Sequence, residues 1–222
     1  MENHEAKDEF LFYSRLSLTE LTGLRAVNLE QLLALVKEVP DSCIFHHTHR
    51  FLRQHLHLSP EPPNDFAYWV FHALGEARLA EALASIDIVR LDSLRAIREK
   101  IASTMEDYMA RSVSARQRFA SENETFHFLK SVSFIFPTGR TARTLPEFAG
   151  QIRQISMDSI YFHMFEARLR LEKGDNDFSL WLAESAGEPE IAEAVSRLDP
   201  YTCTAEGLRS RILDIVERRR AA

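Results

Sequence analysis

The segment Asn64-Asp-Phe-Ala-Tyr-Trp69 recurs in the second half of the chain as Asn176-Asp-Phe-Ser-Leu-Trp181. Further matches keep the same order in both halves and begin with Phe10-Leu-Phe12 and Phe126-His-Phe128, which lie at an offset of 116. Similarity of this kind, in constant order and with few gaps, indicates an internal duplication. The sequence therefore predicts one helical unit that occurs twice in tandem.

Each predicted repeat contains the same series of elements. An alternating aromatic stretch at residues 10–18 or 126–136 has the period-two pattern of a short strand, and a Thr-Gly turn is expected after it at Thr22 and Thr138. The motifs Asn28-Leu-Glu-Gln31 and Thr144-Leu-Pro-Glu147 are typical of helix N-termini. Further helices are predicted from Asp41-Ser42 and Asp158-Ser159, from Asn64 and Asn176 with breaks near Gly75 and Gly187, and over residues 93–111 and 205–220.

The predicted fold is mostly α-helical, with one short β-like segment in each half and the two halves packed as a pseudo-two-fold single domain. The first repeat is expected at residues 9–111, a connector at 112–124 and the second repeat at 125–222. Because each repeat has only a few short elements, the two are expected to share one core. The 7 glycines and 8 prolines are too few for a turn-dense all-β architecture.

Composition narrows the class of protein. The chain is 45% apolar and 27% charged, as in globular proteins, and it carries a net charge of −6 with scattered basic residues. The charge pattern argues against a nucleic-acid partner. No apolar run is long enough to span a bilayer and no signal peptide precedes the first element, so a cytoplasmic protein without a membrane partner is expected. Cys43 and Cys203 are isolated and are expected to be reduced packing residues.

Residues 44–65, IFHHTHRFLRQHLHLSPEPPND, hold five of the nine histidines. His46 and His49 lie three residues apart on a predicted helix, so they can bind a common ion. If one residue is inserted in the second half before Asp158, His46 matches His163 and His49 matches Glu166. One hypothesis is therefore a metal-dependent hydrolase or oxidoreductase whose site, between the repeats, consists of His46, His49, His163 and Glu166.

A helical projection favours an anion over a metal ion. Arg50 and Arg53 fall on the same face as His46, and guanidinium groups repel a divalent cation. The same alignment repeats the pair His46 and Arg53 in the second half, and arginine with histidine can hold phosphate or carboxylate oxygens. The predicted ligand-binding residues are His46, His49, Arg53, His163 and Arg170.

A purely structural explanation of the two arginines stays open. Arg53 is followed by Asp65, and Arg170 by Asp177, each at the start of the next predicted helix, so an Arg–Asp bridge would explain the pattern without a ligand. The chain has no glycine-rich phosphate loop, no Gly-x-Ser-x-Gly and no His-Glu-x-x-His motif. Whether the protein is an enzyme therefore stays open, and neither a catalytic residue nor a cofactor is predicted.

Residues 45–55 and 58–70, FHHTHRFLRQH and LSPEPPNDFAYWV, together with 21–26, LTGLRA, resemble an uncharacterised bacterial and archaeal family of unknown function. The likeness extends over nearly the whole chain. It implies a cytosolic protein and brings no activity. The expected function is a ligand-binding or protein-interaction module, with a small anionic metabolite or another protein, a second copy of the chain included, as partner.

Overall fold

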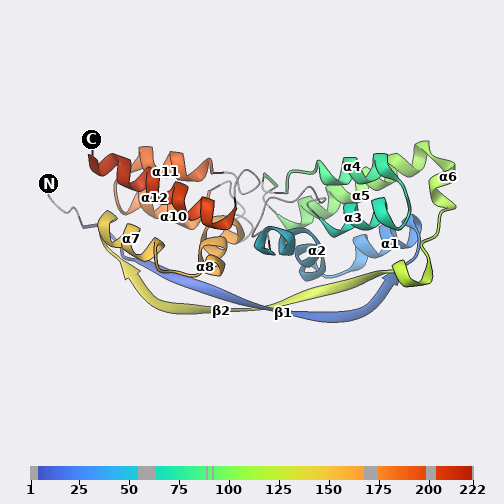
Figure 1. Ribbon diagram of the computed structural model, residues 1–222, viewed down its shortest axis with the longest axis horizontal. Coiled ribbons are helices and arrows are strands. Elements are labelled where there is room, and N and C mark those ends of the chain that lie inside the picture. Colours follow the sequence, from blue (N-terminus) through green and yellow to red (C-terminus); the bar gives the residue numbers. More distant parts are fainter. Residues whose placement is uncertain are drawn as a thin grey trace. The chain divides into compact units, whose positions relative to one another are not determined.

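The computed structural model describes residues 5–54, 64–88, 90–91, 93–167, 175–198 and 204–221, with the side chains of 50–54, 205 and 219–221 left out. In these ranges the chain forms eleven α-helices and one two-stranded antiparallel sheet of β1 (Phe10–Ala26) and β2 (Phe126–Ala142) (Figure 1). The fold is mixed α/β and mostly helical. The prediction of a mostly α-helical domain with only one short β-like segment in each half is therefore wrong, because both strands are 17 residues long and pair as a sheet.

The chain folds as two compact units. Unit 1 contains residues 5–16 and the described part of 133–221, and unit 2 contains residues 17–54 and the described part of 64–132. The strands pair over long sequence distances, since Thr138 Oγ1 donates to Phe12 O in unit 1 and Thr22 Oγ1 donates to Phe128 O in unit 2, both at 2.7 Å. Each strand therefore contributes one of its ends to each unit.

The helices of each unit follow the predicted order. Unit 2 contains α1 (Leu29–Glu38), α2 (Asp41–Gln54), α3 (Asp65–His72), α4 (Ala77–Ala84), α5 (Leu94–Arg111), α6 (Val113–Arg116) and a 3-10 turn (Glu122–Glu124). Unit 1 contains α7 (Leu145–Ile152), α8 (Met157–Tyr161), a π-helical turn (Phe162–Glu166), α10 (Asp177–Glu184), α11 (Pro189–Ser196) and α12 (Ala205–Ala221). None of the helices in the described ranges is long and apolar enough to cross a membrane.

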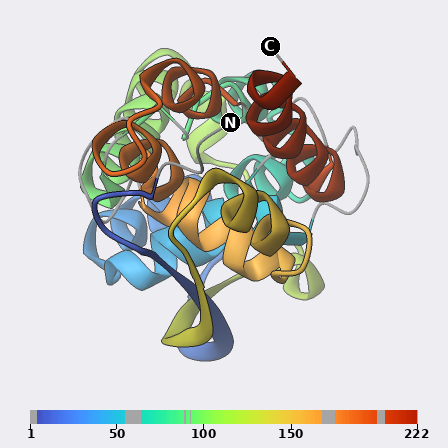
Figure 2. The same cartoon turned by 90° about the vertical axis from the view of Figure 1, so that its left-hand side faces the viewer.

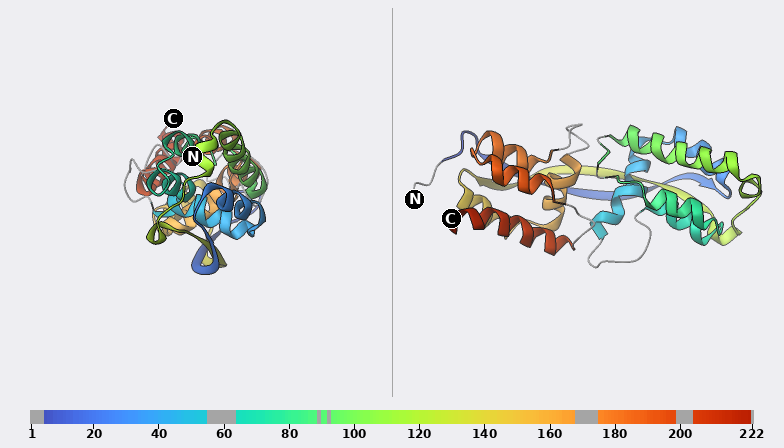
Figure 3. Two further views of the ribbon diagram at one scale, coloured as in Figure 1. Left: turned by 90° about the vertical axis from the view of Figure 1, so that its right-hand side faces the viewer. Right: turned by 90° about the horizontal axis from the view of Figure 1, so that it is seen from above.

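Within each unit, a first group of helices lies next to the strands. In unit 1 these are α7 and α8, with α11 and α12 beyond them (Figure 1, Figure 2). In unit 2, α1 and α2 lie next to the strands, and α4 and α5 lie beyond them (Figure 1, Figure 3). The strands thus lie along one side of each unit, and the helices pack against that side of the strands which faces the core (Figure 1).

Local capping signals begin the helices where the sequence predicts. The Asn28 side chain accepts the Gln31 N–H at 2.9 Å, while Gln31 Oε1 accepts the Val27 N–H at 3.1 Å. Thr144 caps α7 in the same way, and Asn64 and Asn176 cap α3 and α10. These bonds satisfy amides that an α-helix leaves unpaired in its first turn. The predicted breaks at Gly75 and Gly187 are confirmed, since both have positive φ, at 65° and 69°.

The predicted Thr-Gly turns do not end the strands. Gly23 and Gly139 have φ values of 80° and 74°, a conformation that glycine adopts without steric cost. Thr22 Oγ1 accepts the Leu24 N–H at 3.1 Å in addition to donating to β2, so the backbone deviates locally while the strands stay paired. This is the physical reason why β1 continues to Ala26.

Aromatic rings join strand to helix in each core. In unit 1, Phe10 of β1 packs on Phe148, Phe178 and Trp181, with ring centroids 5.4–5.8 Å apart. The Trp181 Nε1–H donates to Asp8 O at 2.7 Å. In unit 2, Phe126 and Phe128 of β2 pack on Phe66, Phe126 packs on Trp69, and the Trp69 Nε1–H donates to Glu124 O at 2.5 Å. Each core therefore needs a strand end that is distant in sequence from its helices.

We expect the buried phenylalanines of the strands to be major determinants of stability. Phe12→Ala in unit 1 and Phe128→Ala in unit 2 should each lower the free energy of unfolding by about 3–5 kcal/mol, because both rings are at most 1% exposed. Single-tryptophan variants separate the two effects in denaturant titrations, since Trp181 reports on unit 1 and Trp69 on unit 2. The control is Phe134→Ala, whose ring is 53% exposed and which should cost less than about 0.5 kcal/mol. An equal cost for all three variants would contradict this account of the cores.

Candidate functional site

The predicted site residues lie in both units. His46 and His49 lie on α2 in unit 2, and His163 and Glu166 lie on the π-helical turn in unit 1. The side chain of Arg53 and the whole of Arg170 fall outside the described residues. Among the residues that are described, no three His, Cys, Asp or Glu side chains come close enough to hold a metal ion.

In unit 2 the helices are connected to β2 by His47, a residue that the sequence analysis left out of the site. The His47 Nε2 atom accepts the Leu129 N–H at 3.0 Å. Its Nδ1 atom lies 2.8 Å from Asp65 Oδ2, at the first residue of α3. Since the amide can only donate, Nε2 carries a lone pair and Nδ1 donates its hydrogen to the carboxylate. The imidazole, 3% exposed, thus links α2, α3 and β2.

In unit 1 His163 makes the same three-way connection. Its Nε2 atom accepts the Tyr13 N–H at 2.8 Å, and its Nδ1 atom lies 2.8 Å from Asp177 Oδ2. Asp177 is the first residue of α10, as Asp65 is of α3. The side chain is again buried, at 2% exposure. Both aspartates therefore accept a hydrogen bond from a histidine. The structural explanation given in the sequence analysis considered only arginine as their partner.

These contacts identify His47, and not His46, as the counterpart of His163. The offset of 116 that relates the strands also relates Tyr13 to Leu129 and His47 to His163. No inserted residue is therefore needed before Asp158. The π-helical turn at Phe162–Glu166, whose hydrogen bonds span one more residue than those of an α-helix, begins just before His163. Keeping the strand offset constant through the next helix would have identified His47 from sequence.

A serine or cysteine one turn before each histidine gives the arrangement the outline of a catalytic triad. In unit 1, Ser159 precedes His163 and Asp177 orients the ring. A general base needs a free Nε2 lone pair beside the nucleophile, but that lone pair accepts the Tyr13 N–H, and the Ser159 hydroxyl donates to Tyr13 O at 2.5 Å. Ser159 and His163 thus bond to the carbonyl oxygen and the amide of Tyr13, the two groups that a neighbouring strand would otherwise pair with.

Cys43 occupies the position in unit 2 that Ser159 occupies in unit 1, one turn before the histidine. The thiol is buried, and this desolvation raises its pKa despite the nearby positive charges of Lys130 and Arg98. A thiol with a raised pKa holds little of the thiolate that nucleophilic catalysis requires. His47 and Asp65 therefore support the strand and do not activate the cysteine.

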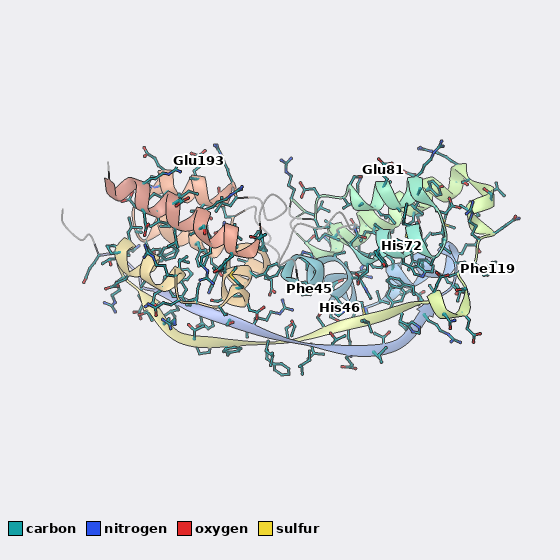
Figure 4. The ribbon with its side chains drawn as sticks, viewed as in Figure 1. Phe45, His46, His72, Glu81, Phe119 and Glu193 are labelled. Carbon is teal, nitrogen blue, oxygen red and sulfur yellow. The ribbon has the colours of Figure 1, made fainter. Side chains whose placement is uncertain are left out.

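The two predicted histidines of α2 are buried and bonded to neighbouring hydroxyl groups. His46 lies on α2 (Figure 4), and its Nδ1 atom lies 3.0 Å from Ser131 Oγ on β2. Thr48 Oγ1 donates to Ile44 O at 2.6 Å, so the 2.8 Å contact between Thr48 Oγ1 and His49 Nδ1 has the imidazole as donor. The His49 ring stacks on Phe45 with centroids 5.0 Å apart. Because the two arginines of the predicted anion site lie outside the described side chains, that site stays a prediction.

Glu166, the other predicted metal ligand, forms a buried ion pair with Arg15 of β1. Arg15 also donates to Ser133 Oγ on β2. Both members of the pair are about one-tenth exposed or less, so each charge balances the other where water is scarce. The pair connects the π-helical turn to both strands within unit 1.

A second buried carboxylate, Glu76, lies in unit 2 at the junction between α3 and α4. Its Oε1 atom lies 2.8 Å from Arg118 Nε, and its Oε2 atom accepts the Tyr108 hydroxyl at 2.5 Å. The hydrogen bond to this carboxylate raises the Tyr108 pKa, and burial adds to the shift. The phenol therefore stays protonated and holds α5 to the junction.

We expect His163→Ala to lower the free energy of unfolding of unit 1 by about 2–5 kcal/mol, because it leaves a buried amide and a carboxylate without their partner and opens a cavity. His163→Gln should recover much of this loss, since an amide side chain can accept and donate. The matched control is His72→Ala on the exposed side of α3, which should cost less than about 0.5 kcal/mol. Denaturant titration monitored at Trp181 measures the change, and an equal loss in the control would contradict it.

The Cys43 thiol should react slowly in the folded protein. Burial and the raised pKa together predict alkylation at about pH 7.5 at least roughly 100-fold slower than in denatured protein. Peptide mass spectrometry after timed treatment with N-ethylmaleimide measures the extent of alkylation of Cys43 separately from that of Cys203. Alkylation of Cys43 at the denatured rate in folded protein would contradict the assignment as a packing residue.

Comparisons with known proteins agree with the resemblance seen in the sequence. No curated protein matches the chain significantly. The solved structure of OrfY from Thermoproteus tenax is similar to this chain with a TM-score of 0.83 and 32% sequence identity, over 99% of each chain. The model of the family of unknown function DUF5752 matches residues 7–217. Because this match spans most of the chain, the protein belongs to the DUF5752 family.

Proposed function

We propose that this protein is a protein-interaction module that binds its partner through exposed apolar side chains of β1 and β2. The observation that carries the proposal is the distribution of these side chains. In the described part of the chain, eight of the twelve exposed large apolar residues lie on the two strands. Clustered apolar side chains on a surface are typical of sites where another protein binds. In unit 1 they are Leu11, Leu16, Phe134, Ile135 and Phe136, and in unit 2 they are Leu18, Leu21 and Leu24.

The aromatic part of this surface lies in unit 1. Phe134, Ile135 and Phe136 are consecutive and each is about half exposed, at 53%, 54% and 46%. In a strand with one covered face, successive side chains alternate between buried and exposed. Three consecutive exposed residues therefore depart from the pattern that the fold alone requires. Aromatic residues supply much of the binding energy at protein interfaces.

Several backbone groups of the two strands are not available to pair with a further strand. At Tyr13 and Leu129 the backbone amides are already bonded to histidine, and Pro137 on β2 has no amide hydrogen to offer. These features limit the pairing of a further strand with the sheet edges. The proposed contact is therefore made by side chains, with ion pairs such as Lys130–Glu20, 2.9 Å apart, at its polar rim.

Two further expectations belong to this proposal. We place the module in the cytoplasm on the basis of its sequence. We also propose that the two halves arose by duplication, which the repeated His–Asp–amide contacts at a constant offset support.

Photo-crosslinking tests the proposed surface. Phe136 in unit 1 or Leu21 in unit 2 is replaced by p-benzoylphenylalanine, and the full chain is irradiated in a lysate of its native host. We expect a discrete adduct from both positions, and a second copy of the chain is recognised by an adduct of twice the monomer mass. Adding Phe134→Ser should reduce the yield about tenfold, because burying one phenyl ring contributes about 1.5–3 kcal/mol to binding.

Two control positions decide whether the adduct is specific. Phe119 is 65% exposed but lies outside the strands, and Glu193 is exposed on α11 (Figure 4). The crosslinker at either position should give no discrete adduct. The same adducts from the controls, or none from Phe136 and Leu21, would contradict the proposal.

A further inference from the structure

We infer that unit 1 contains a binding site for an extended strand segment, and that residues 5–16 of a second copy of this chain fill it. In the folded chain the site holds the chain's own residues 5–16, the N-terminal segment. The site, which we name the strand socket, consists of Phe148, Ser156, Ser159, His163, Phe178 and Trp181. Reciprocal exchange of this segment between two copies gives a dimer. The inference does not rest on the proposed function, because it uses buried contacts and not the exposed apolar side chains.

The strand socket binds the main chain of the N-terminal segment. His163 Nε2 accepts the Tyr13 N–H at 2.8 Å, and the Ser159 hydroxyl donates to Tyr13 O at 2.5 Å. Five residues earlier, Asp8 O accepts the Trp181 Nε1–H at 2.7 Å. These bonds come from side chains of helices, and they hold an extended backbone at two places. A protein that binds a peptide as a strand uses main-chain bonds of this kind for affinity.

The socket also selects side chains of the N-terminal segment. Phe10, Phe12 and Ser14 alternate along β1 and are buried, at 6%, 1% and 6% exposure. The Phe12 ring lies 5.9 Å from the Phe148 ring and 6.3 Å from the Phe178 ring, centroid to centroid. In a strand every second side chain points to the same face, so a site on that face recognises the alternate positions. The socket is therefore specific for a Phe-x-Phe segment.

Unit 2 contains an equivalent site, which is filled by another part of the chain. There Glu124 O accepts the Trp69 Nε1–H, and Phe126 and Phe128 pack on Phe66. In both units the bound segment is Phe-x-Phe, and it comes from the half of the chain that does not supply the helices. Binding between separate parts of the chain is thus already the rule in this fold. A second copy offers unit 1 an identical N-terminal segment.

The course of β1 keeps the free-energy cost of exchange small. The strand is continuous over Phe10–Ala26 and passes from unit 1 to unit 2 at Leu16–Ser17. An extended connection of this kind can lead to the socket of the same chain or to that of another copy. The contacts in the socket are the same in both cases, so exchange alters only the strand pairing near this point and the entropy of association. We therefore expect the dimer when concentrated chains fold together.

Disulfide trapping between two full-length variants tests the exchange. Ser14 Oγ lies 3.3 Å from Ser156 Oγ, so cysteines at these positions can be joined. The donor variant carries Ser14→Cys and the acceptor variant carries Ser156→Cys, both with Cys43→Ser and Cys203→Ser. Each chain has one cysteine, so a disulfide between the variants requires the N-terminal segment of the donor in the strand socket of the acceptor.

The two variants are unfolded, mixed, refolded together and oxidised, and the products are separated by non-reducing electrophoresis. We expect a crosslinked dimer after refolding at about 100 μM, in a yield at least about tenfold higher than at about 1 μM, because association follows mass action. Absence of the crosslinked dimer at the higher concentration would overturn the inference.

A competition experiment identifies the strand socket as the site of contact. Phe12→Ala in the donor should lower the yield about tenfold or more, because the acceptor's own intact segment then wins the socket. The same change in the acceptor should raise the yield several-fold, since the acceptor's own segment becomes the weaker competitor. Phe12→Leu, which keeps an apolar side chain and preserves folding better, should give the same directions with smaller changes. Equal yields wherever the change is placed would overturn the inference.

Two matched controls exclude contact elsewhere on the surface. Ser103 is exposed on α5 in unit 2, and an acceptor with Ser103→Cys in place of Ser156→Cys should give no concentration-dependent crosslink. Phe134→Ser in both variants should change the yield of the original pair by less than about twofold, because this ring is 53% exposed. Equal crosslinking at Ser103→Cys, or loss of the crosslink with Phe134→Ser, would assign the dimer to surface contacts and overturn the exchange.

Discussion

In each unit, one imidazole nitrogen accepts a backbone amide from a strand that is distant in sequence, and much of the structure depends on this bond. The strand segment it holds brings two phenylalanine rings into the core, and the carboxylate on the other side of the imidazole is the first residue of another helix. A neutral ring is the only form that satisfies both partners. Strand packing and helix placement are therefore coupled at one side chain in each unit.

Local signals in the sequence predict the helices well, because a cap acts within a few residues. Asn28 and Asn64 begin their helices as expected, and Gly75 ends one. The strands could not be delimited in this way. Gly23 adopts a positive φ inside a paired strand, and only the opposite strand decides that the chain continues there and does not turn. The division into two compact units could not be predicted from local patterns either. It depends on strand pairing, which connects residues that are distant in the sequence.

The candidate site shows the limit of matching by residue type. His46 seemed to be the counterpart of His163 because the residues around each are alike, but the contacts assign that role to His47. The hydrogen-bond geometry also distinguishes a structural role of these side chains from a catalytic one. Ser159, His163 and Asp177 have the residue types of a hydrolase triad, yet the lone pair and the hydroxyl hydrogen that catalysis would use are both engaged by Tyr13. Composition alone cannot distinguish these two outcomes.

The way the strands are divided between the units constrains the order in which the chain can fold during its synthesis. The Tyr13–His163 bond joins residues 150 positions apart, so the apolar residues of β1 in unit 1 are translated well before the helices on which they pack. Contacts of such long range form slowly, and unpaired apolar strands promote aggregation in the meantime. Unit 2 can close once residue 132 has emerged, while residues 10–16 still lack their helices. During that interval the apolar residues of this segment have none of their core partners in unit 1.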